Sequence, residues 1–246
     1  LLGLKRLPDV STISRSLRST DEVSVEKVRS ESRNLVIERL SAEGLARVTL
    51  DFDGSVLSTG RHAEGTAVGF NRKKKGARSY TAVLTVAQTD QVLDVHHRPG
   101  NVHDSNGADR FIGQCLHSVR SALPRSNIET RIDSAFFNET IAEQLHQAGA
   151  EFTISVPFER FIELKGMIEG RKRWRRLNSE LSFFETRWKP KSWTAPYRFV
   201  FIRKQVRCQD KAPVQLDLFK PTESGYEFKV IVTNKRTSPR KVVAFH

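Results

Sequence analysis

The stretch that decides the fold is Arg47-Val-Thr-Leu-Asp-Phe-Asp53, in which apolar and polar residues alternate. A period of two residues is typical of a β-strand with one buried face. It places the three apolar side chains on that face and Thr49, Asp51 and Asp53 on the opposite one. Gly54-Ser55 follows, and we expect the strand to end there.

The segments on either side of this strand give an order of elements. Upstream, roughly the first forty residues are expected to be helical, because Ser19-x-x-Glu22 matches a capping box and apolar residues then recur at near-helical spacing. Downstream, alternation and turn residues predict a hairpin of strands at 79–87 and 91–97. After it we expect a helix capped by Asp104 or Ser105, a strand at 128–133, a helix at about 138–147 and a strand at 152–156.

Three strands followed by helix, strand, helix and strand is the order of a ribonuclease H-like core. We therefore predict an α/β fold, with a mixed sheet flanked by helices. In such a sheet the ends of parallel strands meet at one edge, where sites are commonly built.

Residues 158–225 interrupt this alternation of strands and helices. They hold all three tryptophans (Trp174, Trp188 and Trp193) and strand-like pieces near 181–188 and 197–206, which we interpret as a β-rich insertion after the fifth strand. A last strand at 226–232 precedes a basic tail. The predicted organisation is a helical segment at 1–45, the ribonuclease H-like core at 46–157, a basic β-rich insertion at 158–225, and a return strand with its tail at 226–246.

The charge is strongly positive and unevenly distributed. The chain carries 41 Lys and Arg against 28 Asp and Glu, a net charge of +13. Residues 1–150 contribute only +2 of this excess, and residues 151–246 contribute +11. Such clustering favours a polyanionic partner, with nucleic acid ahead of membrane because no amphipathic apolar helix accompanies it. A solubilising surface is the alternative.

Cysteine use and hydropathy limit the cellular setting. The two cysteines, Cys115 and Cys208, lie far apart and form no CxxC motif, which favours a reducing compartment over a disulfide framework or a thiolate zinc site. The longest apolar runs fall far short of the roughly 20 residues that a membrane-spanning helix needs. We therefore expect a cytoplasmic protein with no membrane partner.

Asp53 and Asp133 are the candidate catalytic pair. Each stands at the end of a predicted strand, and neighbouring strands would place their carboxylates side by side. Two such carboxylates repel one another unless a divalent cation lies between them, and hard oxygen ligands select Mg²⁺ or Mn²⁺. From spacing alone, two aspartates at strand ends are more commonly turn caps than ligands. Asp51 shares a face with Asp53, so it is either another ligand or a residue with a pairing partner.

Three ordered blocks resemble the DDE transposases of bacterial insertion sequences. The first is Leu50-Asp51-Phe52-Asp53-Gly54-Ser55 followed by His62-x-Glu64-Gly65 and a basic cluster. The second is Arg98-Pro99-Gly100-Asn101-x-His103-x-Ser105-Asn106-Gly107, and the third is Arg131-x-Asp133-Ser134-x-Phe136-Phe137. The resemblance covers the chain from about Leu7 to its end. It implies DNA cleavage and strand transfer at element ends, by way of metal-dependent phosphodiester chemistry.

The resemblance also assigns roles to residues. It makes Asp53, rather than Asp51, and Asp133 ligands of Mg²⁺, for which Mn²⁺ substitutes. It implies a third ligand, a Glu on a helix after the insertion, but no Glu follows Glu227. We therefore expect the chain to be a fragment that stops before this ligand, and to show little cleavage by itself. Double-stranded DNA, as transposon end and as target, and self-association on paired ends at the bacterial nucleoid are implied by resemblance only.

Other candidate residues concern DNA. Two basic groups are predicted to contact it: Lys73, Lys74 and Lys75 in one loop, and Arg171, Lys172, Arg173, Trp174, Arg175 and Arg176 in the insertion. A solvated loop is the plain alternative for the first group, and burial of the tryptophan for the second. Asn101 and His103 are candidates for orienting the site or a phosphate, with turn and capping roles as the alternative.

Two other functions remain open from the sequence. A different ribonuclease H-like nuclease would need its remaining acidic ligands within this chain. A non-catalytic DNA-binding remnant would bind DNA with a steep salt dependence but without a metal site at Asp53.

Overall fold

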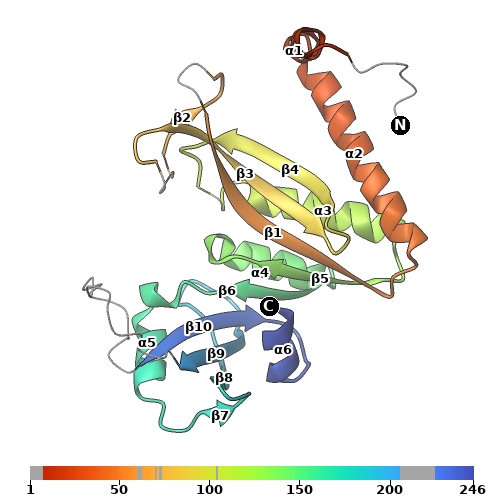
Figure 1. Ribbon diagram of the computed structural model, residues 1–246. Helices are drawn as coiled ribbons and strands as arrows, with labels where there is room; N and C mark the ends of the chain where they lie inside the picture. Colours follow the sequence, from red (N-terminus) through yellow and green to blue (C-terminus); the bar gives the residue numbers. More distant parts are fainter. Residues whose placement is uncertain (1–7, 60–62, 70, 72–73, 104, 206–224) are drawn as a thin grey trace.

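The computed structural model describes residues 8–59, 63–69, 71, 74–103, 105–205 and 225–246 of the chain (Figure 1). The helices and 3₁₀ turns are α1 (Val10–Arg18), α2 (Glu22–Ala42), α3 (Ala108–Ala122), η1 (Ser134–Phe136), α4 (Glu139–Gln147), η2 (Phe158–Arg160), α5 (Ile162–Glu169) and α6 (Pro239–Phe245). The strands are β1 (Arg47–Ser58), β2 (Ala67–Val68), β3 (Arg78–Ala87), β4 (Val92–Pro99), β5 (Asn127–Ile132), β6 (Glu151–Ser155), β7 (Arg175–Arg176), β8 (Leu181–Trp188), β9 (Tyr197–Gln205) and β10 (Tyr226–Thr233).

The strands form one mixed sheet. Its core follows the order β4-β3-β1-β5-β6, in which β1 is antiparallel to β3 and parallel to β5, and β5 is parallel to β6. This is the arrangement expected for three initial strands followed by helix, strand, helix and strand. The predicted α/β fold with a mixed sheet is confirmed.

The strand that opens this core is longer than its sequence pattern indicates. Val48, Leu50 and Phe52 are buried as the alternation predicts. The prediction that the strand ends at Gly54 is wrong, because β1 stays paired with β3 through Ser58, which lies opposite Ser79. A glycine breaks a strand only where the chain turns, and here Gly54 keeps its partner Val83 across the ladder.

The N-terminal region contains two helices rather than one helical run. The expected capping box at Ser19 is wrong: Ser19 ends α1, and the Asp21 carboxylate caps α2 by accepting from the Ser24 amide at 2.8 Å. The α2 helix lies against β4, where Arg29 and Arg33 pair with the buried carboxylate of Asp94.

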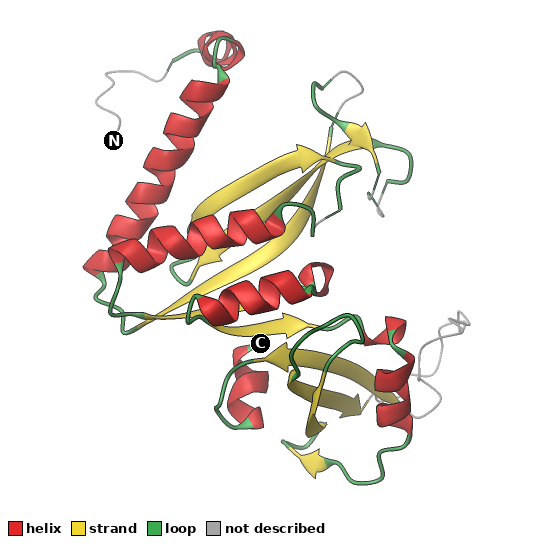
Figure 2. Ribbon diagram, turned by 180° about the vertical axis from the view of Figure 1, so that it is seen from behind, coloured by secondary structure: helices red, strands yellow, loops and turns green. Residues whose placement is uncertain are grey.

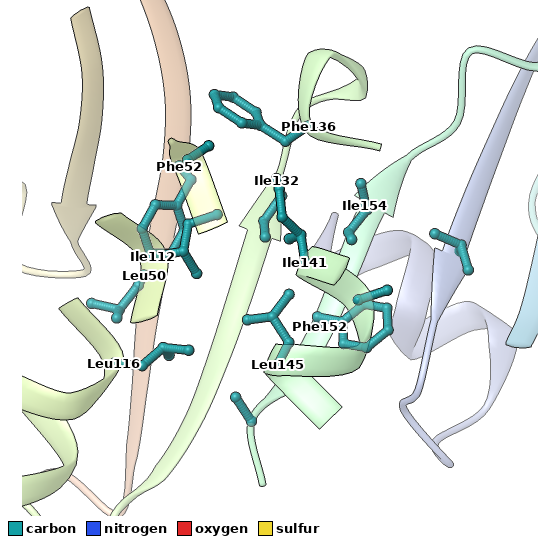
Figure 3. Packing of buried hydrophobic residues seen from close by; sticks show 14 of the residues in the cluster. Leu50, Phe52, Ile112, Leu116, Ile132, Phe136, Ile141, Leu145, Phe152 and Ile154 are labelled. Carbon is teal, nitrogen blue, oxygen red and sulfur yellow. The ribbon is translucent and has the colours of Figure 1, made fainter. Parts of the chain in front are cut away.

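The main hydrophobic core lies on one face of the sheet. Helices α3 and α4 pack over β1, β5 and β6 on that face, which is turned toward the viewer in Figure 2. Ile112 and Leu116 of α3 meet Leu50 and Phe52 of β1, and the ring centroids of Phe52 and Phe111 are 6.3 Å apart (Figure 3). The opposite face carries polar residues of the same strands, including Asp51 and Asp53, and α6 packs on it through Val242.

The region between β6 and β10 extends the same sheet. The β10 strand pairs antiparallel with β6, and β9, β8 and β7 follow it outward. The two strands expected near 181–188 and 197–206 are β8 and β9. A second, smaller core of Val200, Ile202, Ile231 and Val242 joins this extension to α6. The division of the chain into an inserted unit at 158–225 stays a prediction, because the sheet is continuous across it.

Candidate active site

The structure brings Asp53 and Asp133 together. In the parallel pair of β1 and β5, Phe52 lies opposite Ile132. Asp53 follows Phe52 within β1, and Asp133 follows Ile132 directly after the end of β5. Both aspartates line one open pocket, which Asp51, Arg131, Ser155 and His246 also line. Two carboxylates 80 positions apart in the sequence thus share one rim of the sheet.

Neither carboxylate has the turn-capping contact that is its common structural role. Asp133 stands at the N-terminus of η1, but its side chain makes no capping hydrogen bond there. The Asp53 Oδ1 atom accepts from the amide of the adjacent Gly54 at 2.8 Å, within the strand rather than at its end. Both side chains are exposed. Their oxygens are therefore accessible to a ligand from solvent.

Asp51 differs from both of them because a cation engages it on two atoms. Arg131 donates from Nε to Oδ1 and from Nη2 to Oδ2, each at 2.5 Å, in a bidentate pair across the β1–β5 ladder. This hydrogen bonding raises the pKa of Arg131. Arg131 also donates to the Phe245 carbonyl at 3.4 Å, so it links β1 to α6. Asp51 has the pairing partner that its position requires, and Arg131 is the residue that sequence reasoning did not assign.

His246 closes the pocket on the side of α6. Its Nε2 atom lies 2.8 Å from Ser155 Oγ, and its Nδ1 atom lies 2.9 Å from Thr153 Oγ1. Burial, aided by the positive charges of Lys229 and Arg131, lowers the pKa of His246 to about 4. The imidazole is therefore neutral near pH 7 and fixed by two hydroxyls. No sequence signal marked this residue, since its partners lie more than 90 positions away.

Asn101 and His103 lie in the loop between β4 and α3 and do not line the acidic pocket. The Arg98 guanidinium donates to the His103 carbonyl at 3.0 Å and to the Asn106 carbonyl at 2.6 Å. The Nδ1 atom of His103 accepts from the Ser105 amide at 3.2 Å. The second sequence block therefore builds a compact loop, with Arg98 at its centre.

The two predicted basic groups lie at opposite ends of the sheet. Lys74 and Lys75 are exposed in the loop before β3, and Lys73 lies outside the described residues. The other group spans 171–176 and includes β7, the outermost strand of the extension.

In the 171–176 group, the arginines and the tryptophan differ in exposure. The residues other than Trp174 are exposed. The Trp174 ring is half-buried, 4.7 Å from the Phe184 ring, and the Arg203 guanidinium lies 4.7 Å from its centroid. Its Nε1 atom donates to the Arg171 carbonyl at 3.1 Å. The tryptophan thus packs within the extension while the charges around it face solvent.

The acidic pair offers two of the oxygen ligands that a divalent cation requires. Among the described residues, no group of three or more His, Cys, Asp or Glu side chains is placed to hold a metal ion. Asp53 and Asp133 fit such an ion as exposed, uncapped carboxylates, and Asp51 does not because both its oxygens face Arg131. In the part of the chain that the structure covers, no helix is long and apolar enough to cross a membrane.

Three solved structures are similar to part of this chain. The piggyBac transposase in a synaptic complex with hairpin DNA covers 77% of this chain and 34% of its own, at 10% identity and a TM-score of 0.46. The Mos1 transposase paired-end complex with the left transposon end covers 58% of this chain and 49% of its own, at 11% identity and a TM-score of 0.33. The Marinitoga piezophila Argonaute, with 5′ OH guide RNA and target DNA, covers 80% of this chain and 25% of its own, at 8% identity and a TM-score of 0.33.

This chain spans about a third of the piggyBac chain and about half of the Mos1 chain. No curated protein matches its sequence. A family model described as transposase DDE domain group 1 matches residues 4–241, nearly the whole chain. The chain belongs to the transposase DDE domain family.

Proposed function

We propose that this chain is the catalytic core of a transposase that cuts and rejoins DNA at the ends of an insertion sequence. The observation that carries the proposal is the pair of exposed carboxylates that share one pocket, Asp53 within β1 and Asp133 directly after β5. In a folded protein, two neighbouring carboxylates without a cation repel each other, and a divalent ion between them removes that repulsion.

Asp53 and Asp133 would hold Mg²⁺, for which Mn²⁺ substitutes. When bound, such ions activate a water or a 3′-hydroxyl and stabilise the leaving oxygen in an in-line attack on a phosphodiester. Arg131 keeps Asp51 out of the ligand set by occupying both its oxygens. Neutral His246, held by Ser155 and Thr153, borders the pocket without adding positive charge.

The partners follow from the same proposal. The substrate would be double-stranded DNA, both as transposon end and as target, in the bacterial nucleoid. The exposed bases of 171–176 would hold DNA along the extension, and Lys74 and Lys75 would hold it at the other end of the sheet. Pairing of two ends implies a homodimer. The third acidic ligand and the low activity of the isolated chain stay predictions.

Metal-dependent DNA binding tests this function. Without a divalent ion, the acidic pair repels the phosphates that lie over it, so Mg²⁺ at constant ionic strength should tighten the binding of the wild-type chain to a short duplex. The double variant Asp53→Asn, Asp133→Asn should bind DNA more tightly than the wild type without Mg²⁺, and should not respond to Mg²⁺. Asp90→Asn, which changes an exposed turn carboxylate between β3 and β4, is the matched control.

Two results would contradict the proposal. If Mg²⁺ changes the affinity of the wild type and the double variant equally, the acidic pair holds no metal at the DNA surface. DNA affinity with a steep salt slope and no effect of either aspartate would instead indicate the non-catalytic DNA-binding remnant.

A further inference from the structure

A pair of aromatic rings shares the face of the sheet that carries the acidic pair. Directly opposed residues of antiparallel strands point to the same side of a sheet. Tyr80 lies opposite Leu57, which is four residues beyond Asp53 on β1 and therefore on the same face. His97 lies opposite Ala82, two residues along β3 from Tyr80. Helices α2, α3 and α4 pack on the other face, so none of them covers these rings.

The rings of Tyr80 and His97 pack against each other and are held in place by neighbouring residues, and we call this pair the shelf. Their centroids lie 4.1 Å apart with an interplanar angle of 46°. The Tyr80 hydroxyl donates to the Glu64 carbonyl, which fixes the ring at its far end. Gly65, at φ +69°, lies against the ring edge: a Cβ there would come 3.6 Å from Tyr80 Cε1. His97 is exposed and Tyr80 is half-buried, so one side of the shelf faces solvent.

The shelf lines a shallow pocket that is distinct from the acidic one. Glu64, Gly65 and Pro99 complete its wall beside the two rings and Arg98. Flat aromatic walls bind the face of a nucleobase, and stacking of this kind tolerates any base. The Glu64 carboxylate repels a phosphate but accepts hydrogen bonds from the amino group of a base. The Arg98 guanidinium in the same wall already donates to the carbonyls of His103 and Asn106. The chemistry of the pocket therefore favours a base over a backbone phosphate.

The surroundings supply the charge that a nucleic acid needs. Lys74 and Lys75 are exposed in the loop that leads into β3, close in sequence to Tyr80.

The four residues that separate Leu57 from Asp53 correspond to about 13 Å along an extended strand. This is the length of about four nucleotides at the 3.4 Å rise of one DNA strand.

We propose that the Tyr80–His97 shelf binds an unpaired base of the DNA strand, about four nucleotides from the phosphate held at Asp53 and Asp133. This inference rests on the proposed function, because it takes DNA to be the substrate of the acidic pair. It assigns to β3 and β4 a base-stacking site that would favour DNA with a frayed or forked end over a fully paired duplex.

Binding of two DNA probes tests the shelf. One probe is a short duplex, and the other is the same duplex with one strand unpaired at its end and carrying 2-aminopurine there. Wild-type protein should bind the forked probe more tightly and quench its fluorescence. Tyr80→Leu and His97→Ala should each weaken binding of the forked probe by about fivefold or more. About fivefold is the low end of the effect expected when one stacked base is lost. The affinity for the paired duplex should stay unchanged.

Control variants separate stacking from folding. Tyr80→Phe keeps the ring and loses the hydroxyl contact with Glu64, so it should retain the preference for the forked probe. His117→Ala removes an exposed histidine ring from α3, which packs on the other face of the sheet, and should leave both affinities unchanged. His97 is exposed, so His97→Ala keeps the test decisive even if Tyr80→Leu fails to fold.

The outcomes distinguish this inference from the proposed function. Equal affinity of the wild type for both probes, or no effect of Tyr80→Leu and His97→Ala, would overturn the shelf. Mg²⁺-dependent duplex binding through Asp53 and Asp133 would then still stand. A protein that binds neither probe would overturn both.

Discussion

Two charged clusters lie on the same face of the sheet and are built in opposite ways. One lies where β1, β5 and β6 begin, and the other lies at Asp53 of β1 and Asp133 just after β5. The first, which we call the interior cluster, consists of Arg47, Glu129, Glu151 and Lys235, and each of its charges is paired. The Lys235 ammonium contacts the carboxylates of Glu129 and Glu151, and Arg47 Nη1 donates to the same two carboxylates at 3.0 and 2.7 Å. At the open end, Asp53 and Asp133 lie at the pocket rim without a side-chain capping partner at Asp133.

The difference distinguishes carboxylates that are paired within the fold from the two that we propose as metal ligands. Burial by itself raises the pKa of Glu151, but hydrogen bonds from Lys235 and Arg47 outweigh it, and the pKa is lowered overall. Asp51 belongs with this group, since Arg131 neutralises it. Among the described residues of this face, Glu129, Glu151 and Asp51 are each paired with a cation of the fold itself. We propose that the acidic pair at the rim takes its cation from solution.

The largest expected effect is on the interior cluster. Lys235→Met removes the buried ammonium. The Glu129 carboxylate, which is 8% exposed, then keeps its pairing with Arg47 but loses its pairing with Lys235. Breaking a buried pair by removing one partner costs about 3–5 kcal/mol, so we expect the free energy of unfolding to fall by about 3 kcal/mol. Urea denaturation measures it. Lys241→Met, at an exposed position of α6, should change it little, and equal losses in the two variants would contradict the account.

The next effect is a pH dependence of stability due to His246. Its pKa is about 4 in the folded chain, below the usual 6.5, so the unfolded chain binds more protons between these values. Stability is therefore full above about pH 6.5, falls as the pH drops toward 4, and loses about 3 kcal/mol in total. His246→Asn should remove this window from thermal midpoints recorded between pH 4 and 7. An unchanged window would show that other groups cause it.

A smaller effect is expected at the Asp51–Arg131 pair. Its side chains are 33% and 43% exposed, so solvent screens the attraction. Asp51→Asn should lower the free energy of unfolding by about 1 kcal/mol, at the upper end for an exposed pair. Calorimetry of Asp51→Asn and Arg131→Gln measures the loss, and the double variant should lose no more than either single one. Additive losses would indicate that the two residues act independently.

The smallest effect on stability is expected at the acidic pair itself. Asp53→Asn and Asp133→Asn remove mutual repulsion and no ion pair, so each should change the free energy of unfolding by no more than about 0.5 kcal/mol. Chemical denaturation without divalent ions measures this. A loss of about 2 kcal/mol in either variant would mean that the carboxylate serves the fold, as Glu129 does.

The sequence predicts what depends on local pattern. The alternation at 47–53 gives the face on which Asp51 and Asp53 lie, and the order of elements gives the sheet that brings β1 beside β5. Gly54 misleads because a glycine inside a ladder reads like a strand end. Ser19 misleads because the nearby Asp21 is also a good cap, and only the backbone path decides between them.

The rest depends on contacts between distant segments. The pairing of Arg131 with Asp51 follows from the β1–β5 register, which no local pattern contains. Lys235 reads as part of a basic tail, but it is 5% exposed because β10 carries it into the sheet beside Glu129. The Tyr80–His97 shelf likewise requires the register of β3 with β4.

The most direct test of the account is a Mn²⁺ titration followed by electron paramagnetic resonance, on the wild type, Asp53→Asn, Asp133→Asn and Asp51→Asn. The account predicts that the wild type and Asp51→Asn bind Mn²⁺, and that each of the other two variants loses the site while keeping its fold. Equal Mn²⁺ affinity in the wild type and Asp133→Asn would contradict the claim that these two carboxylates share one cation.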